Sequence, residues 1–272
     1  MIVQNGEEGK GSLVIQQREH AMLALRFARK WGNGEFSELH PKELMEFVVE
    51  HHDEGWNEVD PKLGLNADTG LPYSLIQTPF EHLMETGPGG PSYAEARHPY
   101  CGLLVSMHTY GLYNGRYGMS DKVFVKMLPE GKKEVADAML GQELARQERL
   151  RKELSEDAAF SELAGEQELF HNYKLLQFFD TLALYFNCTP ESERSPSTFL
   201  NVPVKPGVDT EVRIERLGEG VYGLSPYPFS EEPAEFHYDG QRIRPQNDAD
   251  ALQSAMDNTP LERENIRFVA IR

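Results

Sequence analysis

The chain of 272 residues carries 27 basic and 44 acidic side chains, which gives a formal net charge of −17. Its hydrophobic share of 39% and aromatic share of 10% are typical of a folded protein, so intrinsic disorder is excluded. The length fits one large domain, or one domain with a smaller appendage. A surface this acidic repels phosphate backbones and anionic lipid, which argues against nucleic acid and membranes as partners.

The cysteines and the N-terminal segment indicate a cytoplasmic protein. Cys101 and Cys188 lie in apolar stretches and form neither a disulfide framework nor a CxxC metal motif, which indicates a reducing compartment. Residues 1–12 are polar and glycine-rich, so we expect no secretory signal. No apolar run approaches the ~20 residues that a membrane-spanning helix needs.

Apolar residues at helical spacing predict helices through most of the first 190 residues. The first runs from about Gln17 to Trp31 and ends at the glycine-rich residues 32–34. The next begins at Pro41 and reaches His51–His52–Asp53. Residues 57–90 are rich in proline and glycine and are predicted to form a long, packed loop. Further helices are predicted at about residues 99–113, 129–154 and 166–186.

After Pro196 the hydrophobic period changes to the alternation that is typical of strands. Asp239–Gly240, between two alternating runs, predicts a hairpin. We therefore expect a mainly α fold, with a helical domain over residues 1–190 and a small C-terminal antiparallel β unit over residues 197–272 packed on it. The predicted strands are residues 211–217, 221–224, 235–238 and 266–271, with a short helix at 248–256 and one early strand at 13–15.

Four residues next to apolar helical stretches form a candidate metal site. His52 and Asp53 stand at the end of a predicted helix, and an ion there needs further ligands from other helices. His20 and Asp180 lie in apolar helical stretches, and a buried aspartate is costly unless it is paired or metal-bound. Imidazole with carboxylate suits Zn, Fe or Mn, and less readily Mg. The sequence therefore predicts one or two divalent metal ions, held by His20, His52, Asp53 and Asp180.

The order His20, His52–Asp53, Asp180 resembles that of the HD-domain superfamily of metal-dependent phosphohydrolases. Residues 52–56, His–Asp–Glu–Gly–Trp, are similar to its His–Asp–x–Gly–Lys motif, with Trp56 in place of a lysine that often serves phosphate. The spacing from Asp53 to Asp180 is also long, because the charged helical stretch 129–154 intervenes. Residues 17–21, 104–108, 176–180, 224–229 and 239–242 also resemble an uncharacterised bacterial family of HD-like proteins. These resemblances imply that the helical domain is HD-like.

The same resemblance implies roles for further histidines. Some HD-like proteins hold two metals, bridged by the aspartate of the HD pair, and use two more histidines. His108, in an apolar helix, is the first candidate to bind a second metal or to contact the ligands of the first metal. His82 or His98 is the candidate for the second histidine. We interpret three histidines as lying outside the site: His40, His171 and His237.

The function that the resemblance implies is hydrolysis of a phosphoester or phosphoanhydride of a small molecule or nucleotide. The metal would activate a water molecule. Asp53 would orient the water, and Glu54 or His51 would move a proton. Four basic residues near the predicted ligands are candidates to bind an anionic small-molecule substrate: Arg18, Arg97, Arg116 and Lys174.

Two other functions stay open on the same scaffold. A di-iron oxygenase of the HD-like kind is favoured by Trp56 in place of the lysine and by the additional histidines. A non-catalytic module that keeps a metal and binds a ligand is the third possibility. The identity of the metal discriminates among the three, and the oligomeric state is left open.

Overall fold

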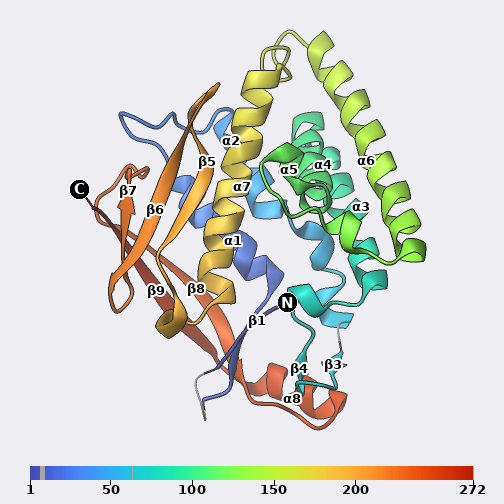
Figure 1. The fold of residues 1–272 in the computed structure, drawn as a ribbon, viewed down its shortest axis with the longest axis vertical. Helices are drawn as coiled ribbons and strands as arrows, with labels where there is room; N and C mark the ends of the chain where they lie inside the picture. Colours follow the sequence, from blue (N-terminus) through green and yellow to red (C-terminus); the bar gives the residue numbers. More distant parts are fainter. Residues whose placement is uncertain (7–9, 63, 272) are drawn as a thin grey trace.

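A computed structural model describes residues 1–6, 10–62 and 64–271. A seven-stranded sheet lies on one side of helix α7, and most of the other helices lie on its other side (Figure 1). The strand order in this sheet is β1-β2-β8-β9-β7-β6-β5. The strands are β1 (Ile2–Gln4), β2 (Ser12–Ile15), β5 (Ser197–Lys205), β6 (Val208–Gly218), β7 (Val221–Ser225), β8 (Ala234–Ile243) and β9 (Leu261–Ala270), with a separate pair of β3 (Leu65–Asn66) and β4 (Leu71–Pro72).

The helices form two layers against this sheet. Helices α1 and α7 contact each other and the sheet, and α4 packs against α7, α2, α3 and α6. Within the part of the chain that the structure describes, no helix is long and apolar enough to cross a membrane. The helices are α1 (Gln17–Arg29), α2 (Lys42–His51), α3 (Phe80–Arg97), α4 (Pro99–Tyr113), α5 (Gly115–Gly118), α6 (Glu130–Glu156), α7 (Glu166–Cys188) and α8 (Ala249–Asn258), with short 3-10 turns η1 (Glu54–Trp56), η2 (Asp60–Lys62), η3 (Leu75–Gln77), η4 (Phe124–Met127) and η5 (Glu191–Glu193).

The predicted fold class is wrong, because the protein is not mainly α with a small C-terminal antiparallel β unit. Helix accounts for 51% of it, and the large curled sheet is mixed and spans the chain. Strands β1 and β2, from the N-terminus, join this sheet through the pairing of Leu13 with Arg242 on β8. Strands β7 and β9 run parallel, while the other neighbouring strands are antiparallel. The division at residues 190–197 stays a prediction, and the sheet takes strands from both sides of it.

The hairpin predicted at Asp239–Gly240 is also wrong, because β8 runs straight through these residues. Asp239 stays in the strand because Arg263, opposite it on β9, donates to both of its carboxylate oxygens at 2.9 Å. At position 240 the strand needs a glycine, because a Cβ there would lie 2.9 Å from the side chain of Leu13. The glycine thus makes room for strand β2 rather than for a turn.

Part of the predicted loop at residues 57–90 is helical. Helix α3 begins at Phe80 and includes Pro88 and Pro91. Its glycines allow it to lie against the turn that follows α2, since a Cβ on Gly90 would lie 3.3 Å from the His52 carbonyl oxygen. From the other side, a Cβ on Gly55 would lie 2.2 Å from the Thr86 carbonyl oxygen. The glycines therefore serve close backbone packing here, which overrides their poor helix propensity.

A cluster of phenylalanines joins the sheet to the helices. Phe268 on β9 is fully buried, and its ring stacks on Phe27 of α1 with centroids 5.6 Å apart. It also lies 5.7 Å from Phe186 of α7 and 5.3 Å from Phe236 of β8. Because α1 and α7 carry two of the predicted metal ligands, this cluster fixes the spacing between them.

We predict that Phe268→Ala lowers the free energy of unfolding by about 3–5 kcal/mol, because it leaves a cavity where two helices meet the sheet. Urea denaturation measures the loss. Leu261→Ala is the matched control, since Leu261 lies on the same strand but is 67% exposed, and it should cost less than about 0.5 kcal/mol. Equal effects of the two substitutions would contradict this role for the cluster.

Candidate metal centre

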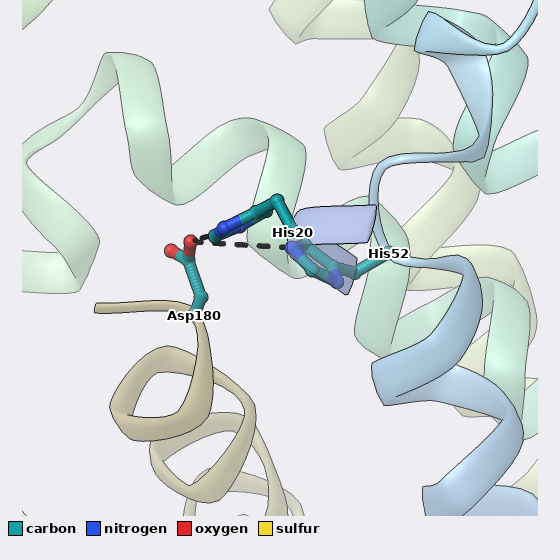
Figure 2. A group of neighbouring side chains, drawn as sticks. All are labelled: His20, His52 and Asp180. Atoms are coloured by element: carbon teal, nitrogen blue, oxygen red, sulfur yellow. Dashed lines mark hydrogen bonds and ion pairs between the residues drawn. The ribbon is translucent and has the colours of Figure 1, made fainter. Parts of the chain in front are cut away.

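Four separate elements bring together the histidines and aspartates of the predicted site. His20 lies on α1, His52 directly follows α2, and Asp180 lies in the middle of α7. Asp53 follows His52 and precedes η1, and His108 lies on α4. All are buried except Asp53, which is partly exposed. Figure 2 shows how the side chains of His20 and His52 approach the Asp180 carboxylate from two different elements.

The first group that could hold an ion consists of His20, His52 and Asp180. His20 Nε2 lies 3.2 Å from Asp180 Oδ1, and His52 Nε2 lies 3.9 Å from the same oxygen (Figure 2). The possible ligand atoms of the three residues all lie within 4.8 Å of one another. A small shift of these side chains would therefore place three ligands around one ion.

The second group consists of His52, Asp53 and His108. His52 Nε2 lies 3.6 Å from Asp53 Oδ2, and His108 Nε2 lies 3.9 Å from Asp53 Oδ1. The two groups share His52, so they form one continuous cluster of three imidazoles and two carboxylates. This donor set suits Zn, Fe or Mn.

The outer nitrogens of two imidazoles are held by neighbours, which fixes the tautomer that a metal requires. His52 Nδ1 lies 2.8 Å from the Val49 carbonyl oxygen, to which it can only donate. His20 Nδ1 lies 3.0 Å from Asn187 Oδ1. A proton on Nδ1 leaves the lone pair of His52 on Nε2, which faces the centre. His20 Nε2 donates to Asp180 Oδ1, and a metal would displace that proton.

A cation fits the centre because two of its buried atoms lack hydrogen-bond partners. His52 Nε2 and Asp180 Oδ2 have none among the residues that the structure describes. An unsatisfied buried polar atom costs about 1–3 kcal/mol, and a charged one costs more. With its proton on Nδ1, His52 Nε2 is an acceptor, as are the carboxylate oxygens. A bound cation would satisfy these acceptors together.

The charges in the centre favour the ligand forms of Asp180 and His108, whereas the pKa of His20 is raised, because the lowering effect of burial is outweighed by Asp180 and Asp53. Burial raises the pKa of the Asp180 carboxyl, but His20, His108 and His52 outweigh burial and hold this pKa well below its usual range. Burial, followed by the nearby His52, lowers the pKa of His108 to about 4. Asp180 is therefore a carboxylate and His108 a neutral imidazole near pH 7, as metal ligation requires.

Sequence reasoning missed Asn187 and Gln177, which hold the imidazoles from outside. Gln177 places its side-chain amide 2.8 Å from His108 Nδ1. With Asp180, the two amides form a polar stripe along one face of α7, at spacings of three and seven residues. Polar side chains at this period in an otherwise apolar helix are the signal that could have identified them.

A cleft opens beside the centre at Asp53, and we call it the Asp53 cleft. Its volume is about 190 Å³, and its lining includes Gln17, Arg18, His51, Asp53 and Glu54. His51 Nδ1 hydrogen-bonds Glu54 Oε2 at 2.6 Å. Of the cluster's residues, Asp53 is the one that lines this cleft. The predicted catalytic residues and the predicted substrate residue Arg18 thus share one opening.

A second cleft, which we call the Arg116 cleft, lies on the Asp180 side. Its volume is about 240 Å³, and both Arg116 and Lys174 line it. Arg116 Nη2 lies 3.6 Å from Asp180 Oδ2, and Arg116 Nη1 donates to Thr181 Oγ1 at 3.2 Å. Two of the predicted substrate residues therefore lie away from the Asp53 cleft.

Several predicted site residues are not part of the cluster. His82 lies on α3, 3.7 Å from Glu85, and His98 caps α4 by accepting from the Tyr100 backbone N–H at 3.0 Å. Neither belongs to the groups that could hold an ion. Arg97 is exposed and lies over the ring of Phe47.

Trp56 does not face the cluster. Its side chain is buried in a small apolar group of Val59, Tyr73, Leu75 and Leu83. The residue at the motif's lysine position thus serves packing here.

His171 is buried on α7, and its Nδ1 has no hydrogen-bond partner among the described residues. It belongs to neither group that could hold an ion. Burial lowers the pKa of this imidazole to about 4. The folded protein therefore holds His171 neutral.

We predict that His52→Ala weakens binding of Mn²⁺ by more than about tenfold, because His52 belongs to both groups. The metal content after incubation and desalting is measured by mass spectrometry. His82→Ala removes a histidine outside both groups and should keep the wild-type metal content. Loss of metal in His82→Ala, or full retention in His52→Ala, would contradict the site.

We also predict that His171→Met makes the free energy of unfolding less dependent on pH between pH 7 and pH 4. Because the pKa of His171 is lower in the folded protein than in the unfolded chain, the neutral ring stabilises the fold fully above pH 6.5. This stabilisation is lost as the pH falls toward about 4. Wild type should therefore lose more free energy of unfolding than the variant between pH 7 and pH 4, measured by urea denaturation at each pH. Parallel curves for the two proteins would exclude this role.

Comparison with known proteins gives a family. The chain matches the family described as "Protein of unknown function (DUF3891)" over residues 1–245. No curated protein and no solved structure matches it. Since the match covers most of the 272 residues, the chain belongs to the DUF3891 family.

Proposed function

We propose that the protein is a metal-dependent hydrolase that acts on a phosphoester or phosphoanhydride of a small molecule. The observation that carries the proposal is the buried cluster of three imidazoles and two carboxylates, whose Asp53 opens onto a cleft. A metal in such a site supplies an activated water and polarises a phosphoryl oxygen. The resemblance of His20, His52–Asp53 and Asp180 to the HD phosphohydrolases supports the same chemistry.

The cleft residues have the chemistry that hydrolysis needs. The Glu54 carboxylate orients the His51 ring through the bond to Nδ1 and also accepts from Asn57 Nδ2 at 2.7 Å. His51 Nε2 is thereby left to exchange a proton with a group in the cleft. Arg18, on the same lining, would bind an oxygen of an anionic substrate.

The cleft's volume of about 190 Å³ is below the range of about 300–1,000 Å³ that is usual for drug-sized ligands. A substrate would therefore place only its reacting group, or a small leaving group, in the Asp53 cleft. The charge of −17 disfavours polyanionic polymers such as nucleic acids, which leaves small phosphorylated molecules as the proposed substrates.

A di-iron oxygenase is the second candidate, and one observation favours it. The two ligand groups overlap at His52 and together offer five ligand residues, more than the four protein ligands of a structural zinc site. Two irons would make the oxidised protein absorb visible light, whereas one Zn or Mg would not.

The test is to measure metal content and then the turnover of model phosphodiesters, phosphomonoesters and nucleotides by protein loaded with Mn²⁺, Fe²⁺, Zn²⁺ or Mg²⁺. We expect metal-dependent hydrolysis of at least one class. His51→Gln and Glu54→Gln should lower kcat by about 10²- to 10⁴-fold, because they remove proton transfer. Their metal content should stay at the wild-type level, since neither residue belongs to the cluster.

Glu58→Gln is the matched control, because Glu58 is exposed and does not line the Asp53 cleft. Its kcat should equal that of wild type. Iron-loaded protein that consumes oxygen and hydrolyses none of these substrates would replace the proposal with the second candidate. Metal-loaded protein without either activity would instead indicate a binding module.

A further inference from the structure

We propose that the Arg116 cleft is a binding site for a small tetrahedral oxyanion, such as the phosphate group of a metabolite. The cleft is separate from the Asp53 cleft, and no residue lines both. The inference goes beyond the proposed hydrolysis, because anion binding here needs neither metal nor turnover. Its volume of about 240 Å³ suits a small ligand.

The charge of the lining is the first reason. Arg116 and Lys174 line the Arg116 cleft, and no carboxylate is among its described lining residues. The Asp53 cleft, in contrast, has Glu50, Asp53 and Glu54 on its wall. In a chain of net charge −17, a cleft with two cations and no acid is a local exception that attracts anions.

The lining also offers neutral hydrogen-bond donors. The hydroxyls of Ser120, Thr181 and Thr198 lie on it. Lys174 pairs with Asp209, which does not line the cleft, so the charge of Lys174 is partly balanced. Arg116 Nη2 lies 3.6 Å from Asp180 Oδ2, a looser pair than that of Lys174, so Arg116 provides more of the positive charge. Its planar fork also matches the geometry of an oxyanion.

The backbone that carries Arg116 is strained, which is the second reason. Residues 115–118 form a turn in the left-handed region, with φ of 51° at Arg116 and 57° at Tyr117. Glycines with φ of 65° and 87° flank them. Left-handed conformations in residues other than glycine cost about 1–3 kcal/mol each and cluster at ligand sites. The strain places the guanidinium between Asp180 and the cleft.

Gln177 gives a third, independent reason. It lines the Arg116 cleft and is 6% exposed; its Nε2 lies 2.8 Å from His108 Nδ1, and its Oε1 has no partner among the described residues. An oxyanion that keeps a proton, as hydrogen phosphate does near pH 7, would donate its O–H to this oxygen.

The experiment is calorimetric titration of the full-length protein with inorganic phosphate, with and without EDTA. We expect one site that persists in EDTA, because its contacts come from the protein's own side chains. Arg116→Asn should weaken binding by at least tenfold, because one charge-assisted contact is lost. Asparagine tolerates the left-handed conformation, so the turn should survive. Lys174→Gln is a second variant, outside the strained turn, and should weaken binding several-fold.

Arg97→Asn is the matched control, since Arg97 lines neither cleft, and it should bind phosphate as wild type does. Absence of binding at millimolar phosphate would overturn the proposal. Binding that disappears with EDTA would place the anion on a metal and would also overturn it, as would binding that both variants retain in full. Because none of these readouts depends on turnover, failure here is distinguishable from failure of the proposed hydrolysis.

Discussion

The burial of the Asp180 carboxylate is the constraint on which the rest of the structure depends. A charge inside an apolar helix is tolerated only when other groups compensate for it. His20 from α1, His52 from the end of α2 and Arg116 from the left-handed turn approach this carboxylate from three directions. Neither imidazole nor the arginine reaches both oxygens, and Asp180 Oδ2 lacks a hydrogen bond among the described residues. The protein therefore leaves a place for a cation at the point where its helices meet.

Helix α7 positions Asp180 because one of its sides packs against the sheet and the other faces the histidines. Phe186 on α7 packs against Phe268 of the sheet and Phe27 of α1. Asp180, with Gln177 and Asn187, faces the histidines. The sheet thus has a mechanical role for the site, since it fixes α1 and α7 at the spacing that brings His20 within reach of Asp180. A cluster of charged groups held so firmly pays little reorganisation when it binds a ligand.

The sequence identified residues better than it identified architecture. The order His20, His52–Asp53, Asp180 could be found because each residue stands out from apolar neighbours, a local signal. The sheet could not be assembled in the same way, because strands β1 and β2 are short, and β2 pairs with β8 more than 200 residues away while β1 pairs with β2. Gly90 was misleading for a related reason: glycine indicates a loop locally, whereas here it serves contact between segments distant in sequence. Asn187 and Gln177 were missed because their roles depend on which imidazole each one faces.

Arg116 connects the candidate metal centre with the Arg116 cleft. Its guanidinium lies 3.6 Å from Asp180 and also lines a cleft that contains no described carboxylate. An anion in that cleft would draw the guanidinium away from Asp180 and free a carboxylate oxygen for a metal. A metal on Asp180 would in turn release Arg116 to the anion. Such coupling is reciprocal, since the free energy by which one ligand favours the other must be equal in both directions. The strained turn then has a physical reason, because it holds Arg116 where the side chain contacts both the buried carboxylate and the cleft.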